Sequence, residues 1–119
     1  MMRPDSDLPE VFICLKPVDF RKGIIGLAEL VTAELGHDPL SSRLFVFTNR
    51  RRNGVKLLCW ERNGFCLWHK RLERDRFHWF RHSEGGVITI TGQQLNWLLD
   101  GYDITKMRPH KMLKYSCVS

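Results

Sequence analysis

The side chains in this sequence that are best suited to chemistry are cationic. Of the 19 Lys and Arg residues, 11 fall between Arg43 and His82, together with only three of the 13 acidic residues. The rest of the chain has more acidic than basic residues, so the formal net charge of +6 comes from this middle segment. Ammonium and guanidinium groups bind phosphate through charge-assisted hydrogen bonds. The distribution therefore predicts a surface that attracts polyanions such as nucleic acid.

The densest cationic run is Arg50-Arg51-Arg52, which we expect in a hairpin loop between two strands. Guanidinium groups in such a loop would reach successive phosphates without reading base sequence. The candidate nucleic-acid contacts are Arg50, Arg51, Arg52, Lys56, Lys70, Arg71, Arg74 and Arg76. The competing interpretation is a solvated loop and, for Arg74 and Arg76, a surface ion-pair cluster with Glu73.

Tryptophans lie among these cations. Trp60, Trp68 and Trp79 are candidates for stacking on unpaired bases, an interaction worth about 1–3 kcal/mol per base. Core packing is the competing role of each ring, because a buried tryptophan removes a large apolar area from water.

A second candidate site is the sequence Asp19-Phe20-Arg21-Lys22. Asp19 is a good helix N-cap, and a helix is expected to follow it. Arg21 and Lys22 would then lie in the first turn, where cations are unfavourable beside the helix dipole. Their presence indicates an external anion or an acidic partner surface, so Asp19, Arg21 and Lys22 are a possible partner or anion site.

The sequence contains no recognisable catalytic or metal-binding motif. It has no Walker-type glycine loop, no G-x-S-x-G, no H-x-H pair and no C-x-x-C pair. We therefore expect a protein that is not an enzyme and binds no metal or cofactor.

No run of 18 apolar residues and no secretory signal is present, so a cytoplasmic, nucleoid-associated protein without membrane contact is expected.

A length of 119 residues predicts one α+β domain. We expect an N-terminal extension (1–10), a single domain (11–103) and a basic C-terminal tail (104–119). The apolar pattern predicts a long helix from Asp19 to Gly36 and a short one from Thr91 to Gly101. Strands are expected at Phe12–Leu15, Leu44–Thr48, Val55–Glu61, Phe65–Leu72, Phe77–Arg81 and Val87–Thr91. Short polar connections favour an antiparallel sheet of five or six strands. Either the helices cover one face each, or one face is left for a partner.

The pair Asn63-Gly64 predicts a tight hairpin and hence a register. If Arg62 opposes Phe65, then Lys56 opposes Arg71, and Cys59 and Cys66 are diagonal neighbours too far apart for an unstrained disulfide. An anion between Lys56 and Arg71 would relieve their repulsion. The alternative is that both side chains extend into water.

Several sequence blocks together resemble a known family. They are Val18-Asp19-Phe20-Arg21-Lys22-Gly23, Asp38-Pro39-Leu40, Leu44–Phe47, Lys56–Trp60, Gly64–Glu73, Ile90-Thr91 and the helix Leu95-x-x-Leu-Leu-x-Gly101. In this order, from about Val11 to Asp103, they are similar to the small accessory protein, often labelled TnpB, of bacterial insertion sequence 66 transposable elements.

The resemblance implies a role in transposition, a form of DNA recombination, beside a separate transposase that carries the catalytic residues. With the basic segment, it indicates a non-catalytic accessory factor that binds DNA through phosphates and assists that transposase. One alternative is a protein-interaction module that docks the transposase without nucleic acid, and a more distant one is a small metal-dependent nuclease. A homodimer through a free sheet edge or face, and a preference for element ends, any duplex, single strands or RNA, stay open.

Overall fold

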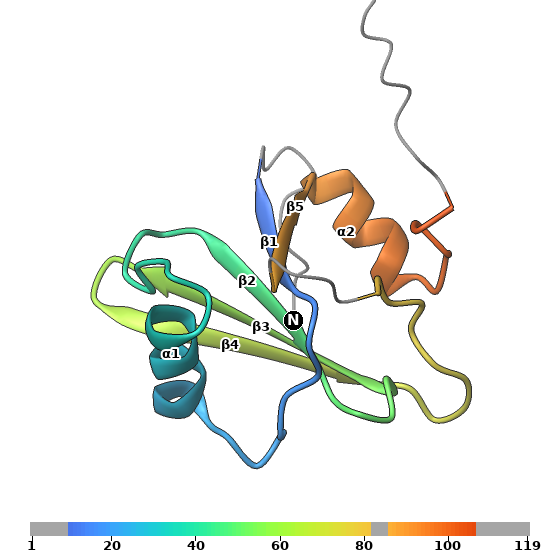
Figure 1. The fold of residues 1–119 in the computed structure, drawn as a ribbon, viewed down its shortest axis with the longest axis horizontal. Helices are drawn as coiled ribbons and strands as arrows, with labels where there is room; N and C mark the ends of the chain where they lie inside the picture. The colour runs from blue at the N-terminus through green and yellow to red at the C-terminus, as the bar shows by residue number, and fades with distance from the viewer. Residues whose placement is uncertain (1–9, 82–85, 107–119) are drawn as a thin grey trace, which may run out of the picture.

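A computed structural model describes residues 10–81 and 86–106 of the chain. Its elements are β1 (Val11–Cys14), α1 (Ile24–Ala33), β2 (Leu44–Thr48), β3 (Gly54–Glu61), β4 (Gly64–Arg71), β5 (Val87–Ile90) and α2 (Gly92–Leu99). The five strands form one sheet in the order β4-β3-β2-β1-β5 (Figure 1). Almost all of the expected N-terminal extension and most of the expected basic tail lie outside the described residues.

The sheet is mixed, so the expectation of a purely antiparallel sheet is wrong. β1 pairs in parallel with β2, with Val11 opposite Leu44, whereas the β1–β5, β2–β3 and β3–β4 pairs are antiparallel. The cause is α1, which carries the chain from the end of β1 back to the start of β2. Two adjacent strands joined by a helical crossover run in the same direction.

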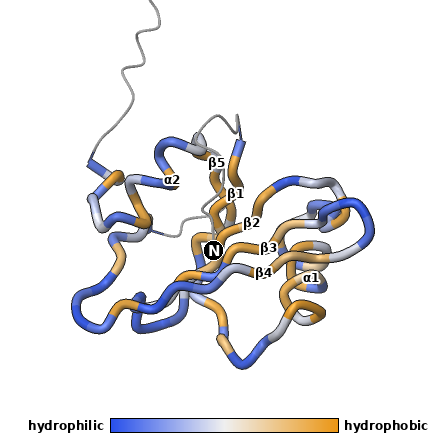
Figure 2. Tube along the Cα trace, turned by 180° about the vertical axis from the view of Figure 1, so that it is seen from behind, coloured by the Kyte–Doolittle hydropathy of each residue, from blue (hydrophilic) through white to orange (hydrophobic). Residues whose placement is uncertain are grey.

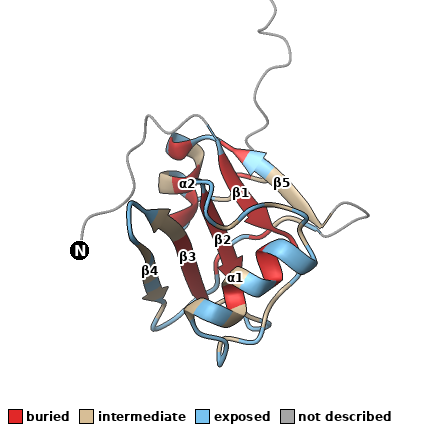
Figure 3. Cartoon of the chain, turned by 90° about the vertical axis from the view of Figure 1, so that its left-hand side faces the viewer, coloured by how far each residue is buried: buried red, intermediate tan, exposed pale blue. Residues whose placement is uncertain are grey.

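Each face of the sheet is covered by one helix. Strand alternation places one set of side chains, including Ile13, Val46 and Leu57, in a cluster with α2. The alternate set, including Phe45 and Leu58, packs with Leu27 and other residues of α1. Figure 3 shows β1, β2 and β3 largely buried, with the edge strand β4 partly exposed. The first of the two alternatives, one helix on each face, is confirmed.

Helix α1 is shorter than the sequence pattern predicts. It begins at Ile24 with Gly23 as its N-cap, so the prediction that Asp19 caps it is wrong. The chain before Gly23 forms a turn in which the Lys22 amide donates to the Asp19 carbonyl at 3.0 Å. Helix α1 ends at Ala33, ahead of Gly36, whose φ of 69° is left-handed.

The segment before α1 is fixed by the buried Lys56 of β3. This side chain is 8% exposed, and its ammonium donates to the carbonyls of Phe20 at 2.8 Å and Lys22 at 3.2 Å. The ammonium also lies 4.8 Å from the centre of the Phe20 ring. The same ring covers Gly54, where an added Cβ would lie 2.9 Å from a ring carbon.

The predicted strand at Phe77–Arg81 is not formed. β4 and β5 are opposite edges of the sheet, so the chain after β4 must cross one face to reach β5. On the way, the Phe77 amide donates to the Arg52 carbonyl at 2.7 Å and the indole of Trp79 donates to the Cys14 carbonyl at 3.1 Å. Both side chains are buried in the cluster with α2. The alternation of apolar residues here reflects packing of an irregular crossing segment on that face.

The β3–β4 hairpin has a register two residues away from the predicted one. Glu61 opposes Gly64, so the turn consists of Arg62, with a left-handed φ of 56°, and Asn63. A shift of two residues leaves every side chain on its predicted face but changes its partner. Lys56 therefore opposes His69, Arg71 opposes Gly54, and the free thiols Cys59 and Cys66 are direct partners. The predicted Lys56–Arg71 and diagonal cysteine pairs are corrected accordingly.

Helix α2 forms as the sequence predicts. The Thr91 hydroxyl accepts from the Gln94 amide at 3.1 Å, and the Gln94 side chain accepts from the Thr91 amide at 2.8 Å. This reciprocal capping box satisfies two backbone donors at the start of the helix. Gly101, with a φ of 98°, follows the C-cap Asp100.

We expect Thr91→Ala to lower the free energy of unfolding by about 1 kcal/mol, since the Gln94 amide loses its acceptor. Urea unfolding followed by tryptophan fluorescence measures the change. Thr91→Ser keeps the hydroxyl and should stay close to wild type, and equal urea midpoints for the Ala and Ser variants would contradict this account.

We expect Gly54→Ala to destabilise the fold by about 1–3 kcal/mol, because the new Cβ meets the packed Phe20 ring. Gly64→Ala, with nothing within 4 Å of its Cβ, is the matched control and should not destabilise. In a double-mutant cycle, Phe20→Leu should absorb part of the Gly54→Ala cost. Strict additivity of the two changes would show that the ring is not the obstacle.

Candidate nucleic-acid interface

Three loops meet at one end of the sheet because of the strand directions. β1 and β2 are parallel, so residues 16–22 and 49–53 leave the sheet at the same end, and residues 72–76 leave β4 at that end too. The Val18 amide donates to the Thr48 carbonyl at 2.8 Å, and the Leu72 amide to the Asn53 carbonyl at 2.8 Å. Figure 1 shows these loops along the lower and lower-right side of the molecule, and Figure 2 shows that they are largely hydrophilic.

We call this surface the basic end. Its cationic residues are Lys16, Arg21, Lys22, Arg50, Arg51, Arg52, Arg71, Arg74 and Arg76. Its loops also carry three carboxylates, Asp19, Glu73 and Asp75. The structure therefore brings together cations from three separate parts of the chain, with a clear excess of positive charge.

The loop from Asn49 to Asn53 is held by its own polar groups. The Asn49 side chain accepts from the Gly54 amide at 3.2 Å and donates to the Asn53 side chain at 2.7 Å. The Arg52 amide donates to the Asn49 carbonyl at 3.0 Å, and Arg52 has a left-handed φ of 60°. This fixed turn leaves Arg50 and Arg51 exposed and Arg52 partly buried.

The loop after β4 also carries cations, interspersed with Glu73 and Asp75, and it is also tightly turned. Arg71, Arg74 and Arg76 are exposed, and Asp75 has a left-handed φ of 64°. Among the described residues, no ion pair joins Glu73 to Arg74 or Arg76. These arginines are thus available to an external anion.

The loop before α1 presents an oriented ion pair. The Asp19 carboxylate accepts from the Arg21 amide at 2.9 Å, from Arg21 Nε at 3.0 Å and from Arg21 Nη2 at 2.6 Å. Hydrogen bonds from Arg21 lower the pKa of Asp19 to about 2, so the carboxylate is ionised at neutral pH. The Arg21 side chain is 91% exposed, so its guanidinium projects into solvent.

The loop before α1 and the arginine loop border a shared open cavity of about 650 Å³. It is lined by Pro17, Val18, Asp19, Phe20, Arg21, Asn49, Arg50 and Arg51. A neighbouring cavity of about 600 Å³ adds Lys16 and Lys22, and also Glu34. An anion lying in either hollow would meet cations from both loops.

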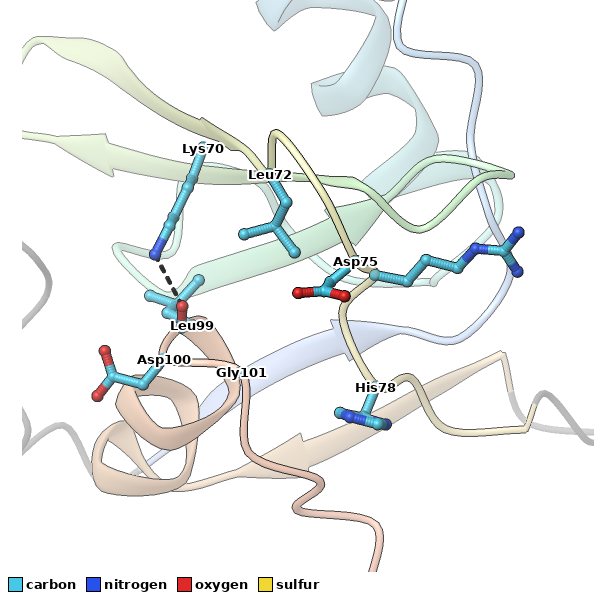
Figure 4. Close-up of a pocket in the computed structure, with 8 residues that line it drawn as sticks. Lys70, Leu72, Asp75, His78, Leu99, Asp100 and Gly101 are labelled. Carbon is cyan, nitrogen blue, oxygen red and sulfur yellow. Dashed lines mark hydrogen bonds between the residues drawn. The ribbon is translucent and has the colours of Figure 1, made fainter.

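Two of the candidate phosphate-binding lysines point into the protein. Lys56 is bound to carbonyls as described above, and Lys70 Nζ donates to the Leu99 carbonyl at the end of α2 at 2.8 Å. Figure 4 shows Lys70 reaching from β4 toward Leu99 at the end of α2. Lys70 lines a cavity of about 650 Å³ that Asp75, His78 and Asp100 also line. In this structure both lysines join elements of the fold, and the Lys70 ammonium binds the Leu99 carbonyl at the C-terminus of α2, where a cation is favourable beside the helix dipole.

His69 is the strand partner of Lys56, and its neutral form is favoured beside that ammonium group. Burial lowers the pKa of His69, and the charges of Lys56 and Arg71 lower it further. Its ring meets the Phe20 ring edge-on at 5.5 Å. A neutral imidazole at this position avoids a further positive charge next to the buried ammonium.

The structure does not bring the three candidate stacking tryptophans together with the arginines. Trp79 is 6% exposed and lies in the core. Trp60 is near the hairpin turn at the opposite end of the sheet, where it packs on Phe65 at 5.0 Å. Trp68 is partly buried against the α2 cluster. None of these rings forms a stacking surface on the basic end.

Sequence reasoning missed that Lys16, Arg21 and Lys22 share a surface with the arginine loop. The signal was present, because a strand, a helix and a second strand in succession favour a parallel crossover. Such a crossover places the carboxyl ends of both strands side by side.

Of the described residues, no cluster of three or more His, Cys, Asp or Glu side chains is arranged to hold a metal ion. No helix in the described part of the chain is long and apolar enough to cross a membrane.

Comparison with known proteins gives one family. The model of the IS66 Orf2-like proteins matches residues 9–109. Two uncharacterised proteins of Sinorhizobium fredii are similar: y4hO is 39% identical over 86% of this chain and 88% of its own length. The second, y4jC, is 31% identical over 91% of each. No solved structure matches. The match over most of the chain connects it with IS66 transposition as an accessory protein, and the chain belongs to the IS66 Orf2-like family.

Proposed function

We propose that this protein is a non-catalytic accessory factor of IS66 transposition that binds DNA phosphates through its basic end and assists the transposase. The observation that supports the proposal most directly is the convergence of exposed arginines from three loops on one end of the sheet. Family membership supplies the context of transposition.

The arrangement suits a polyanion better than a small ligand. The cations are spread over three neighbouring loops, and the cavities between the loops are open and lined by both charged and apolar groups. Exposed guanidiniums in such an array neutralise phosphates along a backbone and release counterions. Because Lys56 and Lys70 are engaged with carbonyls, the proposed contacts are Arg50, Arg51, Arg52, Arg71, Arg74 and Arg76.

A duplex fits this surface better than a single strand. Sequence-tolerant binding of single strands relies on exposed aromatic rings as well as positive charge. At the basic end, Phe77 is 2% exposed, Trp79 is 6% exposed, and the Phe20 ring is packed over Gly54. We therefore expect phosphate contacts to a double helix to dominate.

The experiment is a salt series of duplex binding by fluorescence anisotropy, with two charge-matched double variants. Arg50→Gln/Arg51→Gln removes exposed cations from the basic end, and Arg43→Gln/Arg62→Asn removes two from the opposite end. Asn is chosen because Arg62 has a left-handed φ that Asn tolerates. We expect the first variant to flatten the slope of log K against log salt by about 2, and the second to leave it near wild type.

Three other outcomes would each contradict the proposed function in a different way. Equal effects of the two variants would mean that binding follows net charge and that the basic end is not the contact surface. Absence of wild-type binding at moderate salt would favour the rival function, in which the basic end docks an acidic surface of the transposase. Cleavage of the duplex that requires added Mg²⁺ would instead support the distant nuclease alternative.

A further inference from the structure

The Asp19–Arg21 pair differs from the other charges of the basic end because its geometry is fixed on several sides. The Val18 amide is bound to the Thr48 carbonyl, and the carbonyls of Phe20 and Lys22 are bound to the buried Lys56 ammonium. The segment from Val18 to Lys22 is therefore anchored immediately before and after Asp19 and Arg21. The exposed Asp19–Arg21 ion pair is thus carried by a backbone segment that is held at both ends.

The carboxylate engages one specific edge of the guanidinium. Asp19 accepts from Nε and from Nη2 of Arg21, and it also accepts from the Arg21 amide. A guanidinium has five N–H donors in one plane. With the Nε–Nη2 edge occupied, the edge formed by Nη1 and the second hydrogen of Nη2 is left as a two-pronged donor. Because 91% of the side chain is exposed, that edge faces solvent.

A carboxylate is a poor addition to a surface that only attracts phosphate. Asp19 carries a full negative charge, and it reduces the positive potential beside Arg21 and Arg50. A phosphate contact gains mainly from charge and tolerates many arginine orientations. Readout of a base edge depends instead on a planar donor held in one orientation, which is what Asp19 provides.

We propose that Arg21, oriented by Asp19, reads the major-groove edge of a guanine through O6 and N7 while the arginine loop holds the flanking phosphates. This inference rests on the proposed DNA-binding function and adds a specificity-determining residue to it. Arg21, Arg50 and Arg51 line one cavity, so a backbone bound at the loop places the adjacent groove beside Arg21. Guanine is the base whose major-groove edge offers two acceptors side by side.

The test compares a duplex with the same duplex in which every guanine is 7-deazaguanine, which removes N7 and leaves each phosphate in place. We expect wild type to bind the modified duplex at least about fivefold more weakly at constant salt. A duplex with inosine in place of guanine keeps O6 and N7 and loses only the minor-groove amino group. It should bind like the unmodified duplex.

Two conservative variants separate base readout from charge. Arg21→Lys keeps the charge but has no two-pronged donor, and Asp19→Asn raises the net positive charge while it removes the orienting carboxylate. Both should lose the preference for guanine over 7-deazaguanine, although Asp19→Asn should bind both duplexes at least as tightly as wild type binds the modified one. Both side chains are exposed, so unfolding curves close to wild type are the control for folding.

The possible failures are distinguishable. If wild type binds no duplex, the proposed DNA-binding function fails together with this inference. If wild type binds both duplexes equally, or if Arg21→Lys weakens both by the same factor, Arg21 contacts only phosphate and the inference alone is overturned. Retention of the guanine preference in Asp19→Asn would show that the carboxylate does not orient the Arg21 guanidinium.

Discussion

The parallel pairing of β1 with β2 is the constraint on which the rest of this structure depends. With α1 as the crossover, the carboxyl ends of both strands lie side by side, so Lys16 and Arg50 follow adjacent strands. In an antiparallel arrangement the segment before α1 would sit at the opposite end from the arginine loop, and the cations would be dispersed. The strand order also makes β4 and β5 opposite edges, so the later segment crosses one face of the sheet and fills the core beneath α2.

This convergence concentrates positive charge, and the buried Lys56 shows how the fold accommodates it. In the described part of the chain its ammonium is bound to two carbonyl oxygens and lies over the Phe20 ring, with no carboxylate partner. Carbonyl dipoles and an aromatic face compensate for the loss of water without neutralising the charge. The positive field at the basic end therefore comes from the buried Lys56 ammonium as well as from the exposed arginines. Mutual repulsion between the cations of the basic end disfavours the compact state. A bound anion would reduce that repulsion, so the same charges favour an anionic ligand.

The sequence predicts the elements well where local chemistry decides them. β2 has the predicted bounds, and the capping box at Thr91 starts α2 as expected. The prediction fails where distant parts of the chain compete with local pattern. The long helix predicted from Asp19 is shortened because Lys56, which is far along the chain, binds the backbone that would have been its first turn. The hairpin register shifts because the turn uses Arg62 in a left-handed conformation, a choice that the Asn-Gly signal does not reveal. At the site, the arginine loop could be predicted from the sequence. The link between that loop and Arg21 depends on the parallel β1–β2 crossover, which the succession of strand, helix and strand favours but which the expectation of an antiparallel sheet left out.

The candidate site also shows why a count of cations is a poor measure of a nucleic-acid surface. Lys56 and Lys70 belong to the same basic segment as the arginine loop, but their ammonium groups are directed at carbonyls. Under the proposed function they add to the electric field at the basic end and are assigned no phosphate contact. Field and contact act on different observables: the field raises encounter rates and low-salt affinity, whereas each direct contact adds to the dependence of affinity on salt. Under the proposed function, the orientation of Arg50 and its exposed neighbours would determine how many phosphates are neutralised, and Lys56 and Lys70 would add to the field that attracts the approaching backbone.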